Sequence, residues 1–355
     1  MQINLGRDDD GRRADRIVRR ALSDISLSTV YRLFRQSRVK LGARTLAPED
    51  RLSSGDILLV FLPEDFTASG TSGDARHETH GAEEANMFDA ASLRRLPEAP
   101  RILWESEDLA AFHKPRGMLT HDGAASLDAF AKETLRRSIP PSASFSPGPL
   151  HRLDRNTSGI IMFSKSRYGA EIFSAAVREH KVRKLYVGLA SGRIETEMFL
   201  EDKLVRDGEK KKTIAGRDGR AARLRLRPLA RGEEATLVLI ELFTGLTHQI
   251  RAQLGARGHP LCGDTKYGGD LRCEDTSSAR SSGYFLHAHS LVFPTFLLPD
   301  LPAKISDPLP AEFASRAFEL MRLDEKRSKP APSNGGEAWK SSIDTYILSA
   351  IEATM

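Results

Sequence analysis

The sequence predicts an α+β protein in which a small basic α/β module precedes a larger, strand-rich domain. Three observations support this expectation. Apolar residues recur at helical spacing near the amino terminus, and short β-branched runs around glycine turns follow them. Residues 65–90 then shift to Gly, Ser, Thr, His and acidic side chains. From about residue 100 to residue 323, apolar and β-branched runs bounded by glycine resume.

The amino-terminal module, residues 1–63, is expected to hold two short amphipathic helices followed by strands. The apolar positions of the helices are Ile17, Ala21 and Leu22, then Val30, Leu33 and Phe34. The run SLSTVYRLF supplies a serine that can cap the second helix. VKLGARTL and RLSSGDILLVFLP are typical of short strands around turns at Gly42 and Gly55.

Positive charge is concentrated in this module. Between Gly11 and Lys40 the chain has nine basic residues and two acidic ones, whereas the net charge of the whole chain is +5. Apolar helix faces would turn inward and leave the arginines in solvent. The module therefore suits an anionic partner.

The remaining segments complete the predicted organisation. Residues 64–98 are expected to be a flexible linker, because residues 65–90 contain six carboxylates, one arginine and few apolar side chains. Residues 99–323 form the main domain. Residues 324–355 form a C-terminal tail, in which DEKRSKPAPSNGGE is typical of disorder and WKSSIDTYILSAIEATM of an amphipathic helix.

Several features favour a cytoplasmic protein. The longest apolar stretches, such as ATLVLIELF and SLVFPTFLLP, are too short to cross a bilayer, so no membrane partner is expected. The amino terminus lacks the apolar core of a secretion signal, and Cys262 and Cys273 lack CxxC spacing. We expect a monomer in a reducing compartment.

The order RADRIVRRAL, STVYRLFRQSRVKLGARTL and LSSGDILLV in the module resembles the S4 RNA-binding domain. Downstream, the main domain resembles the RluA-type pseudouridine synthases. The matching stretches are LAAFHKPRGMLTH, HRLDRNTSGIIMFSKS, VRKLYVGLASG, TGLTHQIRAQLGARGHPLCGDTKYGG and FLHAHSLVFP. An S4 module before this domain is the arrangement of the large-ribosomal-subunit enzymes of that family.

The resemblance implies a fold and a reaction. The fold is a mixed, mostly antiparallel central sheet with flanking helices and an RNA cleft. The enzymes break the bond between uracil N1 and ribose C1′, turn the bound base and join C5 to C1′. No metal or organic cofactor is needed, and the partner would be structured ribosomal RNA or transfer RNA.

Three residues match the catalytic positions of the family. Asp154 matches its essential aspartate, which could attack C1′ as a nucleophile or act as a base toward C2′. Desolvation by RNA raises the pKa of such a carboxyl group, so a nearby cation is required. Arg251, in THQIR, matches the arginine that pairs with this aspartate, and Tyr186 matches the tyrosine that stacks on the target base and can help remove the C5 proton.

Further residues are predicted to bind substrate. Arg152 would fill the space of the flipped uridine and Arg155 can reach phosphate, although both could simply be solvated surface arginines. Leu286 would wall the uracil pocket, and Lys184 would face phosphate or support the structure. Lys114, in the strand-to-turn element HKPRG, completes this group. The predicted RNA-binding residues of the module are Arg16, Arg19, Arg32, Arg35 and Arg38.

A second basic region, GEKKKTIAGRDGRAARLRLRPLARG, is expected to lie near a hairpin. Its cations include Lys210, Lys211, Lys212, Arg217 and Arg220. Alternation in ARLRLRPL would place Arg223, Arg225 and Arg227 on one strand face, where they contact RNA backbone or are solvated.

The sequence departs from the family pattern at two positions, and two functions other than the isomerase are considered. Leu246 stands where the family usually has arginine, and Gln253 where it has histidine. Alternatives to the isomerase are a non-catalytic RNA-binding or ribosome-assembly factor and a glycosidase-like hydrolase, although hydrolysis usually employs two acids. A metal site is not expected, because the spacing of the candidate ligands matches no known signature; these are His248, His259, His287, His289 and Cys262.

Overall fold

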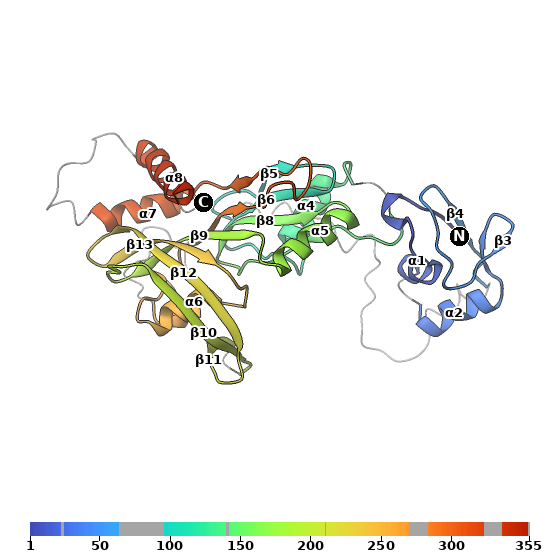
Figure 1. Ribbon diagram of the computed structural model, residues 1–355, viewed down its shortest axis with the longest axis horizontal. Coiled ribbons are helices and arrows are strands. Elements are labelled where there is room, and N and C mark those ends of the chain that lie inside the picture. Colours follow the sequence, from blue (N-terminus) through green and yellow to red (C-terminus); the bar gives the residue numbers. More distant parts are fainter. Residues whose placement is uncertain are drawn as a thin grey trace.

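The computed structural model describes residues 1–22, 25–63, 96–139, 142–209, 211–269, 283–322 and 336–353. Within these ranges the chain forms a four-stranded sheet near the amino terminus and an eleven-stranded sheet in the main domain (Figure 1). Helices pack around both sheets, so the α+β class is confirmed. Most of the predicted linker lies outside the described residues. No helix in the described ranges is long and apolar enough to cross a membrane.

The amino-terminal module has the two predicted helices. They are α1 (Ala14–Ala21) and α2 (Leu27–Arg35), and their inner faces bury Ile17, Val30 and Leu33 completely. The side chain of Ser26 caps α2 by accepting a hydrogen bond from the amide of Thr29 at 3.3 Å. The strands are β1 (Gln2–Asn4), β2 (Val39–Leu41), β3 (Arg44–Thr45) and β4 (Ile57–Val60), in the sheet order β1-β4-β2-β3.

The large sheet has the order β11-β10-β12-β13-β9-β14-β8-β6-β5, with β15 paired to β14 and β7 paired to β8. Its strands are β5 (Arg101–Glu105), β6 (Leu109–Lys114), β7 (Gly148–Pro149), β8 (Ser158–Ser164), β9 (Arg183–Ser191), β10 (Met198–Asp207), β11 (Lys212–Ala215), β12 (Arg220–Arg231), β13 (Ala235–Leu242), β14 (Leu286–Val292) and β15 (Lys304–Ser306). Among the described strands, only β14 and β8 pair in parallel. The mixed, mostly antiparallel sheet expected from the family is therefore present.

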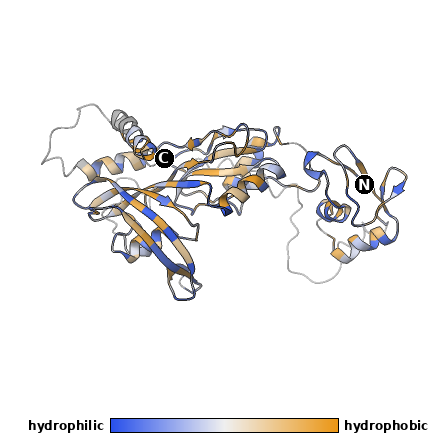
Figure 2. Cartoon of the chain, in the orientation of Figure 1, coloured by the Kyte–Doolittle hydropathy of each residue, from blue (hydrophilic) through white to orange (hydrophobic). Residues whose placement is uncertain are grey.

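Helices and apolar side chains cover the sheet. The helices are α4 (Leu127–Leu135), α5 (Arg167–Arg178), α6 (Gln249–Ala256), α7 (Ala311–Arg322) and α8 (Gly336–Glu352). Strands β6, β8 and β13 are buried along their whole length, and Figure 2 shows hydrophobic residues running through the middle of the domain, whereas hydrophilic residues alternate along β10 and β12. Near α7, Ile347 of α8 packs with Phe313, so the C-terminal helix belongs to the core.

The module is docked onto the main domain through buried carboxylates, which the sequence did not predict. The short helix η1 (Arg7–Asp9) places Asp9 against residues 142–144. One Asp9 oxygen accepts hydrogen bonds from the Ser144 amide at 2.8 Å and the Ser142 hydroxyl at 3.0 Å. Asp8 accepts from the amide of Arg167, at the start of α5, at 2.8 Å. These contacts join the module to the main domain.

Candidate active site

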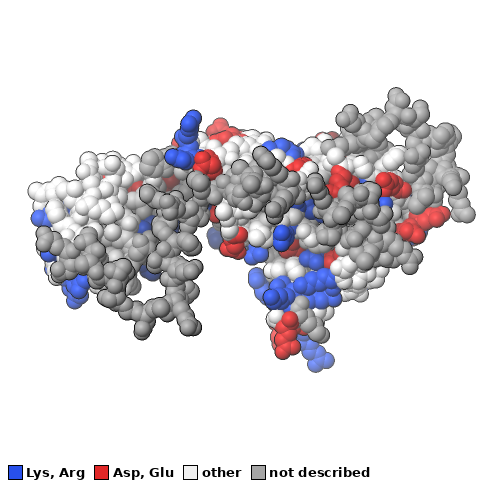
Figure 3. Space-filling model, turned by 180° about the vertical axis from the view of Figure 1, so that it is seen from behind, with Lys and Arg blue, Asp and Glu red and all other residues white. Residues whose placement is uncertain are grey.

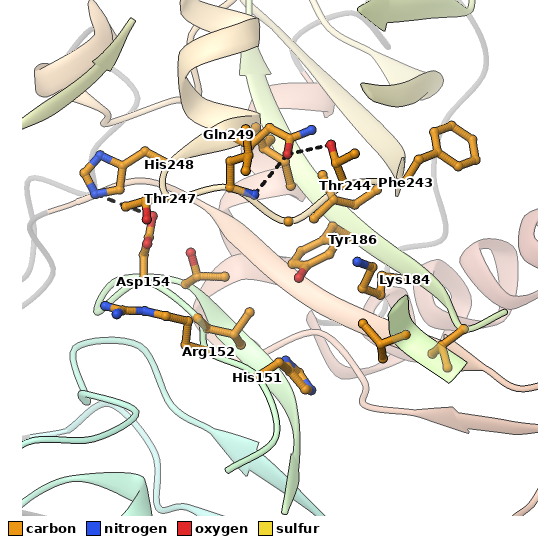
Figure 4. Close-up of a pocket in the computed structure, with 18 of the residues that line it drawn as sticks. His151, Arg152, Asp154, Lys184, Tyr186, Phe243, Thr244, Thr247, His248 and Gln249 are labelled. Carbon is orange, nitrogen blue, oxygen red and sulfur yellow. Dashed lines mark hydrogen bonds and ion pairs between the residues drawn. The ribbon is translucent and has the colours of Figure 1, made fainter. Parts of the chain in front are cut away.

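A cavity of about 460 Å³ lies between the loop of residues 151–157, strand β9 and the segment from residue 242 to residue 251. Figure 4 shows Asp154 and Tyr186 on opposite sides of this space, with His248 beyond Asp154. The loop leads into β8, and residues 248–251 begin α6. Three segments that are distant in sequence therefore meet at one site.

The Asp154 loop is held from behind by the HKPRG element. Lys114 is completely buried, and its ammonium group donates to the carbonyls of Pro115 at 3.0 Å, Met118 at 2.8 Å and Arg155 at 3.1 Å. Burial lowers its pKa to about 7. The structure does not place Lys114 at the cavity, because its donors are directed at the backbone of the loop; this geometry gives the predicted substrate contact no support.

The carboxylate of Asp154 is contacted at a single oxygen. Arg251 Nη1 donates to Oδ2 at 3.4 Å, Tyr284 Oη donates to the same oxygen at 3.4 Å, and His248 Nε2 lies 3.8 Å from it. No hydrogen bond from the described residues reaches Oδ1. The side chain retains 20% exposure. Oδ1 is thus available to a group that enters the cavity.

Arg251 is held in place by a second carboxylate. Its Nε and Nη2 atoms donate to Asp264 at 2.7 and 2.8 Å, which is a bidentate pair. The guanidinium also lies 4.2 Å from the ring centre of Tyr284 and 5.0 Å from that of Tyr267. Burial alone would lower the pKa of Arg251, but the hydrogen bonds with Asp264 raise it overall, so this cation stays charged beside Asp154.

Tyr186 and Lys184, both on β9, form the opposite wall. Burial raises the pKa of the Tyr186 phenol, and the negative charge of Asp154 adds to this effect. At neutral pH the side chain is therefore a neutral ring and hydroxyl, which suits stacking better than proton abstraction. Burial also lowers the pKa of Lys184. Both residues line the cavity.

The other predicted substrate residues divide into two groups. Arg152 is exposed at the rim of the cavity, and Leu286 is 5% exposed in its wall. Arg155 is exposed but does not line the cavity, and its Nε donates to the carbonyl of Gly117 at 3.0 Å. Part of its guanidinium is thus used to hold the loop.

The structure explains why the TSG sequence ends in a glycine, Gly159. Its φ of +115° lies in a region that L side chains rarely adopt, and an added Cβ would lie 2.3 Å from the carbonyl oxygen of Ala288. Gly159 and Ala288 are register partners where β8 and β14 run in parallel. The glycine therefore permits the close approach of the two strands directly behind Asp154.

The two departures from the family pattern have different surroundings. Gln253 is completely buried, and its amide donates to Asp202 Oδ2 at 2.7 Å, which ties α6 to β10. Leu246 lines the cavity and packs against the cluster that contains Tyr267. The first is structural, whereas the second puts an apolar side chain where RNA would enter.

Two groups of exposed cations bear on the predicted RNA contacts. In the module, Arg16, Arg19, Arg32 and Arg35 are exposed, whereas Arg38 is partly buried and donates to the carbonyl of Phe61. Figure 3 shows a second gathering of Lys and Arg where β10, β11 and β12 project from the main domain. We call this the hairpin surface; its exposed cations are Lys203, Arg206, Lys211, Arg217, Arg220 and Arg223. Lys210 lies outside the described residues.

The alternation predicted along ARLRLRPL is confirmed. Ala222, Leu224 and Leu226 are completely buried, so the arginines between them face outward. Two of these arginines have partners within the protein. Arg225 donates to Glu241 at 2.5 Å, and Arg227 donates to the carbonyl of Ala350 in α8.

Sequence reasoning missed four residues of the site: Asp264, Tyr267, Tyr284 and His248. The GDTKYGG run contains Asp264 and Tyr267 and resembles the family. No local pattern indicated that the carboxylate of Asp264 would bind Arg251 together with Asp154. His248 was considered only as a metal ligand. In the parts of the chain that the structure describes, no three His, Cys, Asp or Glu side chains are arranged to hold a metal ion.

Comparisons with known proteins agree with this geometry. Residues 108–256 match the family described as RNA pseudouridylate synthase. The chain is 30% identical over 299 residues to ribosomal large subunit pseudouridine synthase C of Escherichia coli, covering 82% of this chain and 88% of that protein. It is 29% identical over 293 residues to the protein of the same name from Vibrio parahaemolyticus, covering 82% and 87%.

A solved structure supports the fold. Human RNA pseudouridylate synthase domain containing 4 is similar to 66% of this chain over 95% of its own length, with a TM-score of 0.51 and 22% sequence identity. The sequence matches span the loop of Asp154, strand β9 with Tyr186 and helix α6 with Arg251. The chain belongs to the RNA pseudouridylate synthase family.

Proposed function

We propose that this protein converts specific uridines of large-subunit ribosomal RNA into pseudouridine. The observation that carries this proposal is the meeting of Asp154, Tyr186 and Arg251 at one open cavity, although they lie on three separate segments. The relatives named above act, by their names, on the large ribosomal subunit. They match 82% of this chain.

The contacts of Asp154 suit attack on a ribose. The reaction breaks the N1–C1′ bond, forms a C5–C1′ bond and moves one proton from C5 to N1, so the atoms of substrate and product are the same. Arg251 and Tyr284 contact Oδ2. This leaves Oδ1 to attack C1′ or to remove the C2′ proton, and both steps require the ionised carboxylate. Arg251, oriented by Asp264, keeps a positive charge beside it.

The cavity suits a base that has left the RNA stack. Tyr186 and Leu286 offer an aromatic and an aliphatic wall, between which uracil can turn while it remains bound. Arg152, exposed at the rim, can occupy the vacated position in the RNA. The module arginines and the hairpin surface would bind phosphates, which position the RNA without reading its sequence.

Pseudouridine mapping of ribosomal and transfer RNA from cells with and without the gene tests this proposal. We expect one or a few pseudouridines of the large-subunit RNA to be lost in the deletion strain and restored by the wild-type gene. Unchanged maps would support a non-catalytic assembly factor instead. Incubation of purified protein with RNA separates the remaining alternative, because isomerisation leaves the RNA mass unchanged, whereas a hydrolase would release uracil.

A further inference from the structure

A chain of polar contacts connects the hairpin strand β11 with the catalytic carboxylate. The amide of Thr213, in β11, donates to Tyr267 Oη at 2.8 Å. Tyr267 Oη lies 3.0 Å from His248 Nδ1, and His248 Nε2 lies 3.8 Å from Asp154 Oδ2. Figure 4 shows the imidazole directed at this carboxylate.

The donors of this chain can be assigned from simple chemistry. A backbone amide can only donate, so the Tyr267 oxygen accepts from Thr213, and its own hydrogen can be donated to His248 Nδ1. Nδ1 is then the acceptor, and the imidazole proton resides on Nε2. The opposite tautomer would direct a lone pair from Nε2 at the carboxylate, which is repulsive. Tyr267 therefore determines which nitrogen of His248 carries the proton.

The imidazole is neutral at ordinary pH. Burial lowers the pKa of His248 to about 4; Asp154 acts in the opposite direction, and the cations Arg251, Arg206 and Lys266 add to the lowering. Its Nε2–H can therefore donate a hydrogen bond to Asp154 without transferring a proton to it. A charged imidazolium would instead compete with Arg251 for the carboxylate.

The backbone at His248 is held in an uncommon conformation. Its φ of 56° and ψ of 21° lie in the left-handed region, directly before the first residue of α6. The conformation costs free energy for a residue that is not glycine, and such strain persists where surrounding contacts impose it. Here the neighbouring carbonyl of Thr247 accepts a hydrogen bond from the Thr213 hydroxyl at 2.7 Å. Strand β11 thus braces both the backbone and the side chain of this turn.

We propose that His248 is a positioning residue for Asp154: the Nε2–H group, oriented through Tyr267, approaches Oδ2 as RNA fills the cavity and keeps Oδ1 directed at the ribose. The present separation of 3.8 Å is longer than a hydrogen bond, and such contacts commonly shorten in the substrate complex. This inference rests on the proposed function.

Two substitutions of His248 by amide residues test whether the position of the N–H donor matters, because both keep a donor and only one places it correctly. In His248→Gln the Nε2 amide lies at the same number of bonds from Cα as the imidazole Nε2, whereas in His248→Asn the amide stops one atom short. Asparagine also tolerates the left-handed backbone well. In single-turnover assays on ribosomal RNA, His248→Asn should lower the rate constant about 10- to 100-fold with unchanged RNA affinity. His248→Gln should retain most of the wild-type rate.

A matched control lies at the other end of α6. His259 is partly buried and binds the carbonyl of Ser191 at 3.0 Å, outside the cavity, so His259→Gln should be as active as wild type. Thermal midpoints measured for all variants show that each is folded. A wild-type rate in His248→Asn, or an equal loss in His248→Gln and His248→Asn, would overturn the inference.

A double-mutant cycle tests whether Tyr267 acts through His248. Tyr267→Phe keeps the ring beside Arg251 and Lys212 but removes the hydroxyl group that fixes the tautomer. Tyr267→Phe should slow the wild-type protein. It should have no further effect in the His248→Asn background, because the chain of polar contacts is already interrupted there. Additive effects of the two substitutions on the rate would contradict the proposal that Tyr267 acts through His248. Wild-type protein that forms no pseudouridine would instead overturn the proposed function, and this inference with it.

Discussion

At the residue scale, the geometry of the site depends on how the guanidinium of Arg251 contacts two carboxylates, those of Asp264 and Asp154. Arg251 makes its short bidentate contact with Asp264 and only a 3.4 Å contact with Asp154. Asp264 is buried, whereas Asp154 retains 20% exposure. The stronger pair therefore fixes the arginine, and the weaker contact leaves Asp154 free to change partners during a reaction.

Gly159 offers a test of the packing behind Asp154. We expect Gly159→Ala to destabilise the protein and to abolish pseudouridine formation, because the new Cβ would lie 2.3 Å from the backbone oxygen of Ala288. Gly123→Ala is the matched control: its φ is +104°, but no atom lies within 4 Å of the added Cβ, so only backbone strain of about 1–3 kcal/mol applies. Equal decreases in melting temperature for the two variants would contradict this account.

The sequence predicted the central residues of the site but not the contacts that support them. Asp154, Tyr186 and Arg251 matched motifs of the family, and the structure brings all three to one cavity. Asp264 and Tyr284 were missed because they lie about 110 to 130 positions after Asp154, and only folding brings them to it. The backbone contacts of Lys114 were not predicted for a related reason: sequence alone does not show whether an ammonium group faces RNA or backbone carbonyls.

At the element scale, local patterns were reliable and strand pairing was not predictable. The helices at Ala14–Ala21 and Leu27–Arg35 followed from apolar spacing, and the outward-facing arginines of β12 from alternation with buried residues. The pairing of β8 with β14 joins residues 158 and 287, which no short-range pattern can indicate. Strand β1 was missed, because its three residues pair with β4 only after the module has folded.

The helices of the module supply a second prediction. Arg19 on α1 and Arg35 on α2 are exposed, so their joint replacement by alanine should weaken RNA binding with little effect on folding. Each lost phosphate contact should reduce the slope of log affinity against log salt concentration by about 0.7 to 0.9. Binding is measured across a series of salt concentrations.

A control charge lies in the main domain. Arg136, at the end of α4, has a side chain that is 78% exposed and a 4.0 Å contact with Glu133. We expect Arg136→Ala to leave the salt slope unchanged. A slope for the Arg19 and Arg35 double variant that equals that of the wild type would show that the module helices do not bind phosphate.

At the scale of the whole molecule, a buried contact docks the module onto the main domain, whereas most of the predicted linker lies outside the described residues. Composition describes the connecting residues, but it does not reveal that Asp9, outside the linker, binds the main domain. The C-terminal residues were predicted as a tail containing an amphipathic helix; the helix is present as α8, and its residues Ile343, Ile347 and Ile351 are buried against the main domain. Both contacts depend on surfaces that exist only in the folded protein.

The docking contact should respond to pH. Burial alone would raise the pKa of Asp9, but hydrogen bonds from Ser144, Gly6, Ala143 and Ser142 lower it overall. A carboxyl group whose pKa is lower in the folded state stabilises that state above its unfolded pKa of about 4, and this contribution is lost as the pH falls through the folded value. The contribution of Asp9 to docking should therefore be lost in acid.

Small-angle X-ray scattering measures this change as an increase in the radius of gyration. Asp9→Asn should already be expanded at pH 7, because an amide cannot accept all four hydrogen bonds with the strength of a carboxylate. Circular dichroism at each pH monitors whether the domains themselves remain folded. A variant as compact as the wild type at pH 7 would contradict the docking role of Asp9.

The most direct test of the central claim is the single-turnover rate of pseudouridine formation by wild-type protein and Asp154→Asn on large-subunit ribosomal RNA, with RNA affinity measured in parallel. The substitution keeps the shape of the side chain and removes its charge. We therefore predict that the rate falls about 10²- to 10⁴-fold, with nearly unchanged RNA affinity. Pseudouridine formed by Asp154→Asn at the wild-type rate would contradict the account.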